Sequence, residues 1–134
     1  MQETWNDYLK SLSPQLRDLR TGAPEVMKSF SALAQSALRP NALDTKTKEL
    51  IALAISVATR CDDCIGFHAK AAAEQGASRE EIMETLGTAI YLGAGPAVMY
   101  AAHAIDAFDQ LAAAIPAARP PTPEAIPTHV QPPG

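Results

Sequence analysis

The sequence predicts a single-domain, all-α protein, and three properties of its composition lead to that prediction. The chain has 134 residues, which is the size of one domain. Alanine is the most abundant residue, with 26 copies, and β-branched residues are few, which favours helices over strands. Apolar residues make up 47% of the chain and charged residues 19%, so a hydrophobic core can form without a structural metal or disulfide.

The N-terminal part of the chain is expected to form three helices. The segment from Thr4 to about Leu19 has the pattern of two short helices with a break near Pro14. Pro24 follows a Gly-Ala turn and suits the first position of a helix, where its missing N–H would have no partner. This third helix ends near residue 39, and its apolar residues recur at helical spacing as one stripe. The stripe consists of Val26, Met27, Phe30, Leu33, Ala34, Ala37 and Leu38.

A strongly apolar helix is predicted over residues 45–59, with Asp44 as its N-cap. Only Ser56 is polar within residues 50–58, so this helix has no solvent-facing side. We expect it to be buried in the core or at a contact between subunits. Glu49 stands at the start of the apolar run, where its carboxylate would be partly desolvated and suited to act as a base.

Three more helices complete the predicted fold, giving about six in total. One covers residues 62–75, with Gly76 as its C′ residue. Ser78 and Glu81 form a capping box that opens the next helix, and the Gly-Ala-Gly-Pro sequence at 93–96 ends it. The last helix extends to about residue 114. The expected buried positions are Ile82, Leu86, Ala89, Ile90 and Gly93 in the first of these two helices, and Val98, Ala101, Ala102, Ile105, Phe108 and Ala112 in the last.

The chain divides into three regions by composition. We expect an N-terminal helical extension over residues 1–21, a core over 22–115 and a proline-rich tail over 116–134. The last 19 residues hold seven of the 11 prolines, a composition typical of extended or polyproline II structure. His129 lies in this tail and is expected to be solvent-exposed.

Charge and hydropathy exclude several classes of function. The net charge is −4 and no run of Lys or Arg occurs, which argues against binding of nucleic acid or of an anionic membrane surface. The longest apolar run, residues 50–55, is far shorter than the roughly 20 residues that a membrane span needs. The N-terminus also lacks the basic and then apolar layout of a signal peptide. These features predict a soluble, cytoplasmic protein.

The two cysteines form the most specific motif in the chain. A structural disulfide between Cys61 and Cys64 would close a very small loop, so the pair is better suited to redox chemistry or metal binding. If a helix begins near Asp62, His68 follows Cys64 by one turn, on the same face. The helix N-terminus favours a thiolate at Cys61, whereas the imidazole favours one at Cys64. Glu49, on the preceding helix, could orient His68 and complete a carboxylate–imidazole–thiol chain.

The spacing Glu49-x11-Cys61-x2-Cys64-x3-His68 resembles the signature of alkyl hydroperoxidase D-like proteins, within the carboxymuconolactone decarboxylase superfamily. The resemblance covers roughly residues 22–113. It implies an all-α fold that assembles as a homotrimer or homohexamer. It also implies antioxidant, thiol-dependent reduction of a small hydroperoxide, with no organic cofactor or metal. The reductant would be an external dithiol, such as a lipoyl or thioredoxin-like protein.

The resemblance also assigns roles to individual residues. Cys64 would attack the peroxide and become a sulfenic acid, Cys61 would close the disulfide, and Glu49 and His68 would relay the proton. The better-studied peroxidases of the family often carry a histidine immediately before the second cysteine, a position that Asp63 occupies here. Carboxylates between the cysteines disfavour a thiolate by like-charge repulsion, so this departure bears on the rate.

Other interpretations of the motif stay open. A decarboxylase-like lyase would use His68 and Glu49 for proton transfer and leave the cysteines as spectators. A redox-sensing or zinc-binding helical module would use the thiols, with His68 as a third zinc ligand and His103 or Glu49 as a fourth. The cysteines could also be inert. His103 lies off the expected buried stripe and is interpreted as a surface or interface residue.

Overall fold

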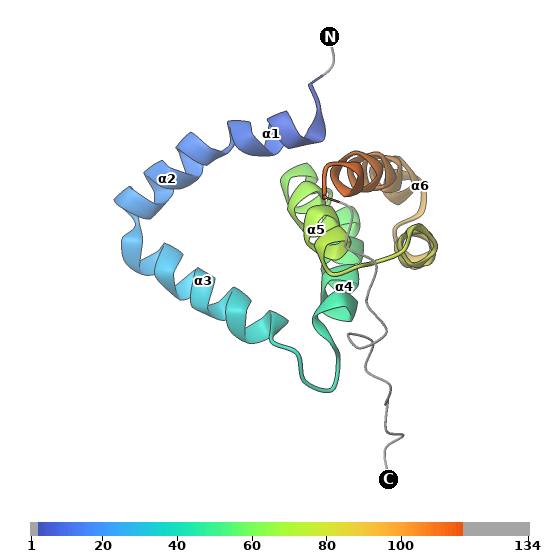
Figure 1. Ribbon diagram of the computed structural model, residues 1–134, viewed down its shortest axis with the longest axis horizontal. Helices are drawn as coiled ribbons and strands as arrows, with labels where there is room; N and C mark the ends of the chain where they lie inside the picture. Colours follow the sequence, from blue (N-terminus) through green and yellow to red (C-terminus); the bar gives the residue numbers. More distant parts are fainter. Residues whose placement is uncertain (1–2, 117–134) are drawn as a thin grey trace.

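A computed structural model of the chain describes residues 3–116, and all regular structure within that range is helical. The helices are α1 (Trp5–Ser11), α2 (Ser13–Gly22), α3 (Pro24–Leu38), α4 (Thr45–Ala58), α5 (Asp62–Glu74) and α6 (Arg79–Ala113), as Figure 1 shows. The expected all-α class is therefore confirmed. The expectations for His129 and for the tail beyond residue 116 lie outside the described residues.

The helix ends follow the capping signals in the sequence. The Asp44 carboxylate accepts a hydrogen bond from the backbone N–H of Thr47 at 2.7 Å and so starts α4. The Ser78–Glu81 capping box forms as expected at the start of α6. The break between the first two helices was expected near Pro14 but lies at Leu12, because a proline is tolerated in the first turn of α2.

The long helix α6 consists of two halves that fold back on each other. Ala94 has φ 55° and ψ −143°, a non-helical conformation that interrupts the helix. Two nitrogens of the Arg79 guanidinium lie 3.0 and 3.2 Å from the carboxylate oxygens of Asp109. In a straight helix these two residues would be about 45 Å apart, so the chain must reverse between them. The expected break is present, although Ala94, and not either neighbouring glycine, adopts the positive φ.

The hydrophobic core lies between α4, α5 and the two halves of α6, which make the most extensive contacts in the described chain. Leu53, Ile65 and Ile82 are completely buried there. The expected inner face of the second half of α6 was partly wrong: Val98 is 47% exposed, and Ala102 is also exposed. The residues that face the core are Ala97, Ala101, Ala104, Ala107, Phe108 and Leu111.

Helices α2 and α3 lie away from this core and bury no residue (Figure 1). The apolar stripe expected on α3 forms, but the described chain covers it only in part, and Phe30 at its centre is 63% exposed. The far side of α4 is also uncovered at Ile51 and Ile55, so the expected burial of α4 on most sides is not reached within residues 3–116. The described part of one chain therefore leaves both of these apolar surfaces uncovered.

None of the helices within residues 3–116 combines the length and apolar character needed to cross a membrane.

Candidate active site

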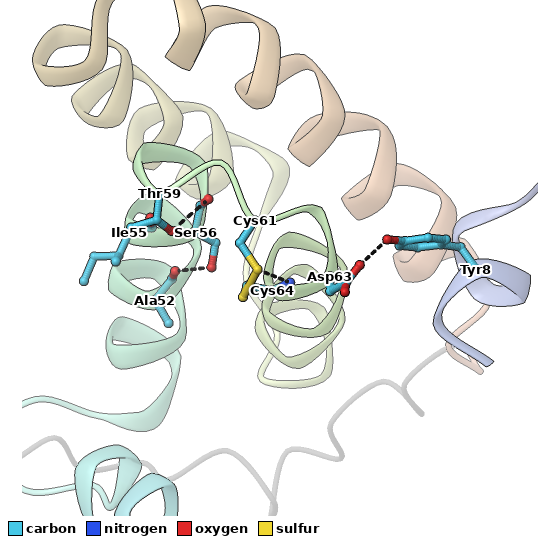
Figure 2. The surroundings of a disulfide bond; sticks show 8 residues. All are labelled: Tyr8, Ala52, Ile55, Ser56, Thr59, Cys61, Asp63 and Cys64. Atoms are coloured by element: carbon cyan, nitrogen blue, oxygen red, sulfur yellow. Dashed lines mark hydrogen bonds between the residues drawn. A yellow bond between two sulfur atoms is a disulfide. The ribbon is translucent and has the colours of Figure 1, made fainter. Parts of the chain in front are cut away.

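The two cysteines meet at the N-terminus of α5. Cys61 is the N-cap residue, and its sulfur accepts a hydrogen bond from the backbone N–H of Cys64 at 3.2 Å. The Cα atoms of the two cysteines are 5.2 Å apart, and the residues are joined by a disulfide bond. Figure 2 shows the pair beside the C-terminal end of α4. When the bond is reduced, the positive end of the α5 dipole favours the thiolate form of a sulfur at this position.

The loop that leads into α5 is held by the end of α4. Arg60 has a positive φ of 58°, which turns the chain sharply after α4. The backbone N–H of Cys61 then donates to the carbonyl of Ser56 at 3.0 Å. This bond fixes Cys61 against the last turn of α4 and sets where α5 begins.

A second pair of polar residues connects α4 and α5. The Glu49 carboxylate, only 5% exposed, lies 2.7 Å from Nδ1 of His68, whose side chain is about one-third exposed. Because an ionised carboxylate can only accept, we assign the proton of this hydrogen bond to Nδ1. Nε2 of His68 is then the nitrogen that can accept a proton.

The four residues singled out in the sequence therefore lie on two adjacent helices. Cys61 caps α5, Cys64 and His68 lie in its first two turns, and Glu49 reaches His68 from α4. The contact between Glu49 and His68 is the one expected from the sequence. The arrangement provides a thiol pair, an imidazole one turn away and a buried carboxylate that orients it. Such a group can take a proton from a sulfur and hold it during attack on an electrophile.

The aspartates between the cysteines are held by Tyr8, which the sequence did not single out, and by His103, which it offered only as an alternative zinc ligand. Asp62 accepts from Nδ1 of His103, on α6, at 2.8 Å. Asp63 accepts from the hydroxyl of Tyr8, on α1, and Figure 2 shows its carboxylate directed away from the disulfide. These contacts join residues 41 and 55 positions apart in the chain. No periodicity marks such long-range pairs, so sequence patterns could not have found them.

The contact with Asp63 changes the acid–base behaviour of Tyr8. It raises the pKa of the Tyr8 phenol to about 12. The hydrogen bond is the largest cause, and desolvation by burial is the next. The negative charges of Asp63, Asp62 and Glu3 act in the same direction. Tyr8 therefore remains a neutral hydrogen-bond donor over the whole physiological range of pH.

An open cavity of about 310 Å³ lies between α1 and the start of α5. Its lining residues are Glu3, Thr4, Trp5, Tyr8, Asp62 and His103. Neither cysteine lines this cavity, so it borders the aspartate side of the α5 turn. Within residues 3–116, no three His, Cys, Asp or Glu side chains are arranged to hold a metal ion.

The fold and the site together define an all-α protein with a CxxC disulfide beside a carboxylate–imidazole pair. Residues 24–107 match the model of the carboxymuconolactone decarboxylase family, and the chain belongs to that family.

Solved structures agree with this assignment, and an uncharacterised relative is similar over most of its length. A carboxymuconolactone decarboxylase family protein from Legionella pneumophila is 48% identical, with a TM-score of 0.78 over 81% of this chain and 96% of that one. One from Thermotoga maritima, for which an involvement in antioxidative response has been suggested, is 33% identical, with a TM-score of 0.70 over 78% of this chain and 89% of that one. An uncharacterised protein of Cupriavidus necator is 37% identical over 77% of this chain and 91% of its own length.

We predict that Tyr8 ionises near pH 12 and not near its ordinary value of 10.0. Because the folded protein favours the neutral phenol, the stabilising contribution of Tyr8 is complete below pH 10.0 and disappears as the pH rises through about 12. Spectrophotometric titration of phenolate, compared between the parent and Tyr8→Phe, isolates this group. The phenolate absorbance that the parent has and Tyr8→Phe lacks should titrate near pH 12. Asp63→Asn should lower the pH midpoint of that absorbance. If the titration step that Tyr8→Phe removes is centred near pH 10.0, the hydrogen bond to Asp63 is contradicted.

Proposed function

We propose that this protein is a thiol-dependent peroxidase and disulfide oxidoreductase that reduces hydroperoxides through Cys61 and Cys64. The observation that supports this most is His68, which follows Cys64 by one turn of α5 and is hydrogen-bonded to buried Glu49. A burial this deep is costly for a carboxylate unless a partner compensates it. The hydrogen-bonded pair of Glu49 and His68, next to a reducible disulfide, is suited to proton transfer at sulfur.

The proposed cycle starts from the reduced dithiol. Nε2 of His68 takes the proton from the Cys64 thiol, and Glu49 stabilises the resulting imidazolium through Nδ1. The thiolate attacks the O–O bond of a hydroperoxide. The bond breaks, the distal oxygen joins sulfur as a sulfenic acid, and the leaving alkoxide receives the proton as an alcohol, or as water from hydrogen peroxide.

The second half of the cycle restores the thiols. Cys61 attacks the sulfenic sulfur of Cys64, which releases water and forms the disulfide present in this structure. An external dithiol then reduces this bond by exchange and is itself oxidised. A lipoyl or thioredoxin-like protein is the class of donor we propose. A reducing compartment such as the cytoplasm would keep that donor supplied with electrons.

An antioxidant role agrees with the comparisons. The Thermotoga maritima relative has been connected with antioxidative response, and it covers most of this chain at 33% identity. The position of Cys61 at the α5 N-terminus adds a second contribution, because the helix dipole favours negative charge on the sulfurs.

We also propose that the protein works as a homo-oligomer, a trimer or a hexamer. The support is the pair of uncovered apolar surfaces. One is the α3 stripe around Phe30 and Leu33, and the other is the far side of α4 at Ile51 and Ile55. Contiguous exposed apolar residues of this kind mark contacts with another protein. A second copy that carries the same two surfaces can cover both of them.

We predict that His68→Gln slows oxidation of the reduced dithiol by tert-butyl hydroperoxide by about 100-fold, the size of a general-base contribution. Glu49→Gln should slow it by a smaller factor, because the imidazole remains but is less well oriented. Stopped-flow measurement of the loss of free thiol gives these rates.

Glu80→Gln, an exposed carboxylate in the first turn of α6, is the matched control and should react like the parent. Parent-like rates in His68→Gln would contradict the proposed relay. A decarboxylase-like lyase gives a different pattern: its proton transfers would fail in His68→Gln and Glu49→Gln, but Cys64→Ser would leave its turnover intact.

We predict that Phe30→Glu disrupts the assembly, because it places a charge at the centre of the α3 apolar stripe. Light scattering coupled to size exclusion should show the parent as a trimer or hexamer and this variant as a smaller species. Gln35→Glu adds the same charge on the opposite side of α3 and should leave the mass unchanged. A parent that elutes as a monomer would contradict the proposal.

A further inference from the structure

The N-terminal helix α1 contributes a residue to the turn that carries the dithiol, although it lies outside the part of the chain that matches the family model, residues 24–107. Its Tyr8 hydroxyl donates to Asp63, between the two cysteines. The other residue between them, Asp62, is bonded to His103 of α6. Both carboxylates of the CxxC turn are therefore held by side chains from other helices.

The position of Tyr8 is fixed by the way α1 docks onto α5 and α6. Trp5 packs edge-on against Tyr8, with 5.8 Å between the ring centroids, and its Nε1–H donates to Asp106 at 3.0 Å. Its backbone N–H donates to Gln110 at 2.9 Å. Two hydrogen bonds from Trp5 thus hold α1 against α6, and the ring contact within α1 orients Tyr8 toward the turn.

Gly66 of α5 makes this close docking possible. A Cβ atom at this position would lie 2.6 Å from Cδ2 of Leu9 and 3.2 Å from the indole ring of Trp5. Leu9 is the one residue of α1 that is buried. The absence of a side chain at Gly66 therefore lets α1 lie directly on the helix that carries the cysteines.

The location of the carboxylates matters because a thiolate forms beside them. A carboxylate near a sulfur disfavours the thiolate by like-charge repulsion, and the effect grows as the two charges approach. In Figure 2 the disulfide lies on the α4 side of α5, and Asp63 points the other way, toward Tyr8. A donor on that far side both keeps the carboxylate at a distance and spreads its charge through a hydrogen bond.

We propose that Tyr8 and His103 are positioning residues of the dithiol site, which hold Asp63 and Asp62 away from the sulfurs so that reduced Cys64 forms its thiolate at a lower pH. This role rests on the proposed function only in treating Cys64 as the reacting sulfur. It assigns α1 a part in the chemistry of the site in addition to its part in the fold.

Several other ionisable groups surround this turn and contribute to the same balance. Unlike Asp62 and Asp63, none of these groups lies between the cysteines. The groups are Glu3 before α1, Glu49 on α4, Arg60 in the preceding loop, His68 on α5 and Asp106 on α6. All of them are left unchanged in the variants below, so a difference between variants reports on the aspartates.

The test measures alkylation of the Cys64 thiol by iodoacetamide as a function of pH, in a Cys61→Ser background. Serine is itself a favourable N-cap, so this background keeps the start of α5 and leaves one thiol. We expect Tyr8→Phe to move the pH midpoint of alkylation upward and to lower the rate below that midpoint about threefold to tenfold. His103→Ala should act in the same direction through Asp62. No peroxide is present, so this result does not depend on peroxidase activity.

The rescue variant separates positioning from a merely structural role. Adding Asp63→Asn to Tyr8→Phe removes the freed charge and should return the midpoint to that of the background protein or below it. Emission of Trp5, the only tryptophan, reports whether α1 stays docked and should be unchanged. Tyr91→Phe, at an exposed position of α6, is the control and should have no effect.

Three results would overturn the proposal. One is an unchanged midpoint in Tyr8→Phe. Another is an upward shift that Asp63→Asn does not reverse, since the effect would then not pass through the carboxylate. The third is a shift accompanied by a change in Trp5 emission that persists with Asp63→Asn, which would assign Tyr8 a structural role alone.

Discussion

The hydrogen bond between buried Glu49 and His68 is the constraint on which the geometry of the site depends. A carboxylate that is 5% exposed needs a partner, and His68 supplies it at 2.7 Å. This requirement fixes the register of α4 against α5. Cys64 precedes His68 by one turn of α5, so the two side chains lie on the same face of that helix. No buried side-chain nitrogen or oxygen in the described part of the chain lacks a hydrogen-bond partner, so this polar contact fits the surrounding apolar core without leaving others unpaired.

Helix α6 packs against both of the helices that carry this pair, and α1 packs against α5. The two halves of α6 fold back at Ala94 and cover the faces of α4 and α5 with alanines and larger apolar side chains. Helix α1 crosses α5 at Gly66 and reaches the cysteine turn through Tyr8. Helix α3 projects from the core and offers its apolar stripe to another molecule. The chemistry of the site therefore depends on contacts between distant segments, and the proposed oligomer depends on the part that the core leaves uncovered.

Local signals in the sequence predicted much of this structure. Asp44, the Ser78–Glu81 box and Gly76 mark helix ends because capping involves only neighbouring residues. The contact between Glu49 and His68 could be expected because one carboxylate stood at the edge of an apolar helix and one imidazole followed the cysteines. The catalytic roles assigned to these residues remain predictions.

Other features could not be read from the sequence for physical reasons. In the second half of α6, alanines occur on every side, so periodicity did not show that Ala97 faces inward and Val98 outward. The positive φ falls at Ala94, although either neighbouring glycine would adopt a positive φ more readily, so composition alone did not show which residue takes it. The partners of Asp62 and Asp63 lie on helices far along the chain, and pairing at that distance leaves no local pattern.

The central claim is that Cys61 and Cys64 form a peroxide-reactive dithiol, and intact mass spectrometry tests it most directly. The reduced protein and its Cys64→Ser variant are each treated with stoichiometric tert-butyl hydroperoxide. The account predicts that the parent promptly loses the mass of two hydrogens as the disulfide forms, and that the variant does not. A parent that keeps both thiols after this treatment would contradict the account.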